Sequence, residues 1–201
     1  MDEKKIAVNI YAENTPNAAA MKFVSDYRLM EKDYNLEFAN AQEAMNVSPL
    51  ASKIFEFPFV KSVHIKPTFI TIIKNDLAQW EDVAMHMREL IRDFIRNGIP
   101  ALNSEEDIPT KEKEHIEIVP ETDDDMSKKI MEILDTYVKP AVESDGGTIQ
   151  FKSFKDGVVN VALGGSCNGC PSTTVTLKGG VERLLTQMLP GQIKEVVSIE
   201  P

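Results

Sequence analysis

Apolar residues recur every three to four positions along residues 80–95, which is the period of an α-helix. The residues in this stripe are Trp80, Val83, Ala84, Met87, Leu90, Ile91, Phe94 and Ile95. Asn97-Gly98 follows the stripe and is typical of a helix end. We therefore predict one long helix with its stripe in the core. Ser48-Pro49 combines a capping hydroxyl with a proline suited to the first helical position, and predicts a short helix over Leu50–Phe57.

Three other segments of the first half alternate apolar and polar residues or are rich in β-branched ones. They are Lys5–Ala12, Val60–Ile65 and Phe69–Lys74. Alternation and β-branching favour β-strands. Three strands and the helices make the first half an α+β domain.

The second half predicts the element order α-β-β-α-β. These elements are a helix over Met126–Val138, strands over Thr148–Phe154 and Val158–Leu163, a helix over Ser172–Leu189 and a strand over Ile193–Ile199. Pro140 is expected to stop the first helix, because proline lacks the amide proton that the helix needs. Lys155-Asp156-Gly157 joins the two strands as a hairpin loop.

The net charge of −10 is concentrated in one segment. Residues 104–125 hold 10 acids and 2 bases, whereas 126–201 hold 8 of each and 1–103 hold 14 acids and 12 bases. A run of like charge with few apolar residues does not form a core. We therefore predict an N-terminal domain over 1–103, an acidic, mobile linker over 104–125 and a C-terminal domain over 126–201.

The same numbers exclude several classes of function. Neither domain has the excess of Lys and Arg that nucleic-acid binding requires. No apolar run approaches the roughly 18 residues needed to cross a bilayer, so we expect no membrane partner. The first residues, Met1 to Lys5, resemble neither a secretory signal nor a transit peptide, which predicts a cytoplasmic location.

The two cysteines of the chain, Cys167 and Cys170, stand three residues apart in a glycine-rich loop. A lone C-x-x-C pair in an intracellular chain suggests metal or redox chemistry. Pro171 suits the first turn of the helix that follows. Both thiols would then lie beside the positive end of the helix dipole, which favours the thiolate that binds metal.

Two thiolates do not complete a four-thiolate iron–sulfur site or a closed zinc site. The simplest source of two more ligands is a second copy of the chain, with one cluster shared across a two-fold axis. His64, His86 and His115 are weaker candidates, because they are expected on a strand, on the amphipathic helix and in the linker.

Two other functions use the same pair of thiols. A thiol–disulfide oxidoreductase of the C-x-x-C type is one, although its motif follows a strand in a larger βαβ architecture. A zinc-stabilised interaction module is the other. No Ser/His/Asp set, phosphate-binding loop or pair of catalytic carboxylates emerges from order and spacing, so we expect no turnover enzyme.

The chain resembles the NifU-like (Nfu) scaffold family in both halves. The C-terminal matches are Val138-Lys139-Pro140, Ser144-Asp145-Gly146-Gly147, Gly165-Ser166-Cys167-Asn168-Gly169-Cys170-Pro171-Ser172 and Thr176-Leu177-Lys178. The N-terminal matches are Asn14-Thr15-Pro16-Asn17, Met21-Lys22-Phe23, Ser48-Pro49-Leu50-Ala51 and Phe69-Ile70-Thr71-Ile72. Gly179-Gly180 replaces a more common single glycine, and we expect these glycines to allow close approach of a strand or subunit.

The resemblance implies a protein that assembles or carries an iron–sulfur cluster, usually [4Fe-4S], and transfers it to apo-proteins. Cys167 and Cys170 would bind the cluster between two copies of the chain. The implied partners are a second copy, apo iron–sulfur client proteins and upstream cluster assembly proteins. The N-terminal domain, which has no obvious ligands, is expected to recognise partners.

Overall fold

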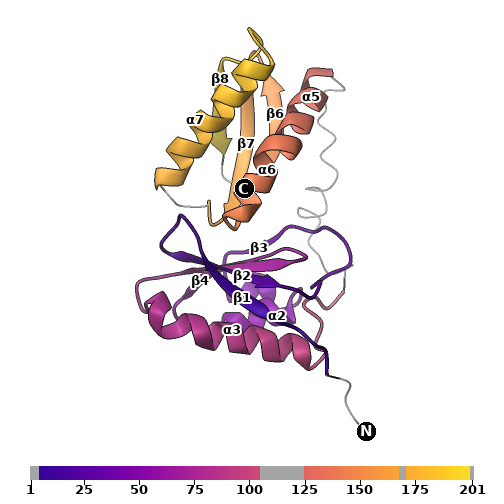
Figure 1. Cartoon of the computed structure of the whole chain (residues 1–201), viewed down its shortest axis with the longest axis vertical. Helices are drawn as coiled ribbons and strands as arrows, with labels where there is room; N and C mark the ends of the chain where they lie inside the picture. Colours follow the sequence, from indigo (N-terminus) through magenta and orange to yellow (C-terminus); the bar gives the residue numbers. More distant parts are fainter. Residues whose placement is uncertain (1–4, 105–124, 168–170, 200–201) are drawn as a thin grey trace. The chain divides into compact units, whose positions relative to one another are not determined.

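The structure is a computed structural model that describes residues 5–104, 125–167 and 171–199, with no side-chain description for 171–175. Two compact units are formed, one within residues 1–116 and one within 117–201 (Figure 1). The predicted linker lies outside the described residues except for Ser104 and Asp125. Its mobility and the exact domain boundaries stay predictions.

The N-terminal unit is a five-stranded antiparallel sheet with helices. Its elements are β1 (Ile10–Asn14), β2 (Ala20–Ser25), β3 (Leu36–Phe38), α1 (Ala41–Ala44), α2 (Pro49–Ile54), β4 (Val60–Ile65), β5 (Phe69–Lys74) and α3 (Trp80–Arg96). The strand order is β1-β2-β5-β4-β3. Both α2 and α3 lie on one face of the sheet (Figure 1). The α+β class and the strands over β4 and β5 are confirmed.

Two strands of this sheet were not predicted, and a third begins later than expected. β2 lies between β1 and β5, and β3 pairs with β4 at the other edge. The predicted strand over Lys5–Ala12 is paired only from Ile10 onward. The physical reason is that strand pairing is decided by partners distant in the chain, which a local pattern does not reveal.

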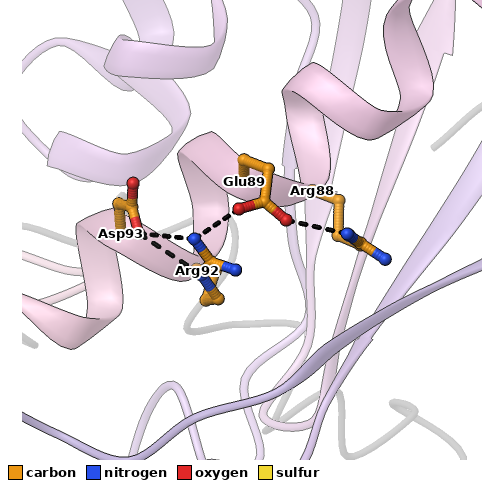
Figure 2. A network of polar contacts seen from close by, with 4 residues as sticks. All are labelled: Arg88, Glu89, Arg92 and Asp93. Atoms are coloured by element: carbon orange, nitrogen blue, oxygen red, sulfur yellow. Dashed lines mark hydrogen bonds and ion pairs between the residues drawn. The ribbon is translucent and has the colours of Figure 1, made fainter.

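The long helix α3 follows its predicted stripe. Trp80, Met87, Ile91 and Ile95 are buried in the N-terminal core, and Gly98, with φ of 73°, ends the helix as expected. On the solvent side, Glu89 pairs with Arg88 and Arg92, and Arg92 also contacts Asp93 (Figure 2). These ion pairs are partly exposed, so each contributes at most about 1 kcal/mol.

The C-terminal unit has the predicted α-β-β-α-β order. Its elements are α5 (Asp125–Ile133), a π-helical turn (Leu134–Val138), α6 (Lys139–Ser144), β6 (Gly147–Lys155), β7 (Val158–Gly165), α7 (Pro171–Met188) and β8 (Glu195–Ile199). β6 pairs with β7 antiparallel, and β8 pairs with β7 parallel. One core joins both helical segments to the sheet; its members on the helices are Ile130, Ile133, Leu134, Val138, Val142, Val181 and Leu185.

The expectation that Pro140 stops the first helix was wrong. The backbone N–H of Lys139 donates to the carbonyl of Leu134, five residues earlier, and the helix then continues as α6 to Ser144. The wider π-helical turn places Pro140 in the first turn of a new α-helical segment. There its missing N–H is tolerated.

The hairpin between β6 and β7 has the predicted loop. Asp156 and Gly157 both adopt positive φ, 54° and 86°, as a two-residue turn of this type requires. Within the described residues no helix is both long and apolar enough to span a membrane.

Candidate functional site

Cys167 lies two residues after the end of β7, in the segment that precedes α7; we call residues 166–170 the cysteine loop. Gly165 has φ of 59°, a conformation that favours glycine. The Cys167 N–H donates to the Gly164 carbonyl at 3.3 Å. The chain therefore turns sharply as it leaves the strand, and Pro171 begins α7 as predicted.

The cysteine loop is held against the turn that precedes β6. The Ser166 N–H donates to the Gly146 carbonyl at 3.1 Å, and the Ser166 hydroxyl donates to the Asp145 carbonyl at 2.6 Å. Gly146 has φ of 76°. These two bonds fix the backbone on the N-terminal side of Cys167.

The Cys167 side chain points into the C-terminal unit. It is 3% exposed and belongs to the C-terminal core with Leu163 and Ile149. A Cβ built on Gly147 would overlap the Cys167 sulfur. A soft thiol at the end of a glycine-rich turn is the donor type that suits iron–sulfur clusters and zinc.

Cys170 lies outside the described residues, so the expected pairing of the two thiols stays a prediction. The two described histidine candidates, His64 and His86, belong to the N-terminal unit, whereas Cys167 belongs to the C-terminal unit. His64 is on β4, where its Nε2 contacts Asn35 Oδ1, and His86 is exposed on α3, 5.4 Å from the Phe57 ring. His115 lies outside the described residues. Among residues 5–104, 125–167 and 171–199, no three His, Cys, Asp or Glu side chains form a metal-binding group.

Two features of the site were missed from the sequence. Asp145-Gly146-Gly147 suggested only a turn, whereas Gly147 also borders the Cys167 sulfur. Ser166, between a glycine and a cysteine, gave no signal of its two bonds to that turn.

The expectation that Gly179 and Gly180 admit a neighbouring strand was wrong. No described atom lies within 4 Å of a Cβ built on either glycine. Close approach of a second subunit there stays a prediction.

Two family models match the chain. Residues 10–98 match the model described as "Scaffold protein Nfu/NifU N terminal", and residues 130–197 match the NifU-like domain. The chain belongs to the Nfu/NifU-like family. The resemblance found from the motifs is thereby confirmed.

Curated relatives support membership in this family of iron–sulfur cluster scaffold proteins. A protein of Drosophila sechellia named as a mitochondrial iron–sulfur cluster scaffold homologue, NFU1, is 37% identical over 191 residues. That alignment covers 95% of this chain and 64% of the relative. The homologue of Drosophila persimilis is 35% identical over 196 residues, 98% of this chain and 66% of its own length. The chain thus spans about two-thirds of these relatives.

A solved structure of a NifU-like protein from Saccharomyces cerevisiae is also similar. It has 25% sequence identity and a TM-score of 0.44, and the match covers 52% of this chain and 91% of that one. The two Drosophila proteins are named as mitochondrial, so the cytoplasmic location of this Nfu/NifU-like chain stays a prediction.

Proposed function

We propose that this Nfu/NifU-like protein is an iron–sulfur cluster carrier that binds its cargo through Cys167 and Cys170. The observation that carries the proposal is the fixed turn at the end of β7, where Gly165 and Ser166 hold Cys167 at the start of the cysteine loop. A cluster passed by ligand exchange needs thiolates on a loop between complete elements, so that the fold does not depend on the metal.

The proposed cargo is a [4Fe-4S] cluster shared between two copies of the chain. Such a cluster takes four thiolates, and each chain has two cysteines. Two cysteine loops facing each other across a two-fold axis would supply the set. The partners are then a second copy, upstream assembly proteins and apo-protein clients that receive the cluster.

We also propose that the protein is a carrier and not an enzyme. The thiol oxidoreductase and the zinc module are the alternatives that the same cysteines allow, and no comparison favours either. The N-terminal unit is proposed to recognise partners.

Anaerobic reconstitution with ferrous iron and sulfide, followed by visible absorption, tests the proposal. The full chain should turn brown, and Cys167→Ser and Cys170→Ser should each lose the cluster while keeping the far-ultraviolet circular dichroism of the parent. Thr186→Ser, on the exposed side of α7, is the matched control and should retain the cluster. A colourless full chain that binds one zinc ion per dimer would establish the zinc module instead. Retention of a complete cluster by either cysteine variant would contradict the assignment of Cys167 and Cys170 as the cluster ligands.

A further inference from the structure

The space beside Gly147 is filled by the sulfur of Cys167. Gly147 is the first residue of β6 and pairs with Gly165 of β7. A Cβ on Gly147 would overlap the Cys167 Sγ and would lie 3.3 Å from both the Cys167 Cβ and the Gly164 carbonyl oxygen. We call the space bordered by Gly147 and Gly164 the thiol pocket.

The backbone at position 147 does not itself require glycine. Gly146 and Gly165 have positive φ, but Gly147 does not. Any L-residue can adopt its conformation, so the requirement at this position is for space. That space is occupied by the sulfur of a proposed ligand.

The walls of the thiol pocket are fixed. The two hydrogen bonds of Ser166, to the carbonyls of Asp145 and Gly146, join the turn before β6 to the cysteine loop. Packing of Cys167 with the C-terminal core closes the pocket on its inner side. Interiors this densely packed do not accept one more carbon without a shift.

A sulfur in this pocket is in the wrong place to hold a shared cluster. Cys167 is 3% exposed, whereas a cluster bridging two copies must be reached from the surface of each. The described position of the Sγ is therefore sheltered from solvent, and ligation of a shared cluster requires the Sγ to leave it.

We propose that Gly147 is a positioning residue for Cys167: it leaves room for the sulfur in the thiol pocket, so that the metal-free thiol is shielded from reagents in solvent until a cluster is bound. The statement that the sulfur leaves the thiol pocket to bind a cluster rests on the proposed function. The shielding of the thiol from reagents does not, because it concerns the metal-free chain alone.

Alkylation by iodoacetamide, followed by mass spectrometry, tests the proposal on the metal-free full-length chain. In a Cys170→Ser background Cys167 is the single thiol. It should react about a hundredfold more slowly in the native protein than in urea, because only open states react. Adding Gly147→Ala should raise the native rate by about tenfold or more, since the new methyl group displaces the sulfur. Equal native rates with Gly147 and Ala would overturn the proposal.

Two controls separate displacement of the sulfur from general loosening of the unit. Gly180→Ala, where no described atom lies within 4 Å of the new Cβ, should leave the Cys167 rate unchanged. Val161→Cys, at a position of β7 that is 2% exposed, serves as a reporter in the Cys170→Ser background with Cys167 retained, because peptide mass spectrometry follows the two thiols separately. Gly147→Ala should accelerate labelling of this reporter much less than labelling of Cys167, and an equal acceleration at both thiols would refute a local effect.

A double-mutant cycle tests whether the Cys167 sulfur is the atom that a side chain at position 147 would displace. Gly147→Ala should lower the urea midpoint of the C-terminal unit when Cys167 is present and should lower it much less in a Cys167→Ala background. An equal decrease of the urea midpoint in both backgrounds would show that Gly147→Ala disturbs the backbone and not the sulfur, and would contradict the proposal. If reconstitution fails but Cys167 is labelled slowly, the cluster-binding function is wrong and the thiol pocket stands. If the protein binds a cluster but its metal-free form is labelled fast, the thiol pocket is wrong and the cluster-binding function stands.

Discussion

The hydroxyl of Ser166 donates a hydrogen bond to the backbone carbonyl of Asp145 at 2.6 Å. This bond connects the residue before the first cysteine to the turn that ends α6. The position of Cys167 therefore depends on a segment distant in the sequence.

Ser166→Ala should loosen this connection. Loss of one hydrogen bond of a buried hydroxyl should cost the C-terminal unit about 1 kcal/mol. Hydrogen exchange measured over β7 is the appropriate readout, because it reports on the C-terminal unit alone, whereas a chain of two units gives no single two-state free energy of unfolding. Ser153→Ala is the control: it removes only an exposed hydrogen bond from Asn160 Nδ2 on β7, so it should change exchange little. Equal exchange in the two variants would mean that the bond contributes nothing.

Two glycines of the C-terminal unit should respond to alanine with opposite signs. Gly165→Ala places a Cβ at φ of 59° and should destabilise the unit by about 1 kcal/mol. Gly180→Ala lies within α7 with open space around it and should stabilise the metal-free unit by about 1 kcal/mol. Hydrogen exchange over β7 in the metal-free protein checks both. Destabilisation by Gly180→Ala would indicate that a neighbour absent from the isolated chain needs that space.

Two serines of the N-terminal unit should also respond differently to alanine. The Ser48 hydroxyl accepts from the Ala51 N–H at 3.0 Å and donates to the Ala101 carbonyl at 2.7 Å, so Ser48→Ala should cost about 2 kcal/mol. The Ser52 hydroxyl is buried and has no hydrogen-bond partner among the described residues, so Ser52→Ala should be neutral or stabilising.

Trp80 is the single tryptophan and packs against Phe23 in the N-terminal core. Its fluorescence during urea unfolding therefore reports this unit alone. Equal midpoints for Ser48→Ala and Ser52→Ala would contradict the assignment of bonded and unbonded hydroxyls.

Elements set by local pattern were predictable from the sequence. The stripe of α3 and the turn at Asp156-Gly157 are determined by neighbours a few residues away, and both formed as predicted. β3, three residues long, exists only because β4 pairs with it. The helix continues past Pro140 because the Lys139 N–H donates to the carbonyl of Leu134, five residues earlier, instead of four. No residue pattern indicates this change.

The candidate site could likewise be predicted only in part from the sequence. The spacing of Cys167 and Cys170 identified the thiols, and Pro171 identified the start of α7. The roles of Gly147 and Ser166 could not be predicted, because both arise when the hairpin brings the turn before β6 beside the end of β7.

Removal of iron should reverse association of the protein. If only a dimer holds the cluster, the cluster stabilises the dimer by mass action. Sedimentation of reconstituted protein before and after treatment with an iron chelator should show a dimer converted largely to monomer. A dimer that persists unchanged at the same concentration would show that association is independent of the cluster.

Native mass spectrometry of the anaerobically reconstituted full chain tests the central claim most directly, because one mass gives both the number of chains and the cluster. Four thiolates from two chains predict a dimer with a single [4Fe-4S] cluster, which is about two irons and two sulfides per chain. A monomer carrying four irons would contradict the account, since two cysteines and ligands from elsewhere would then complete the site.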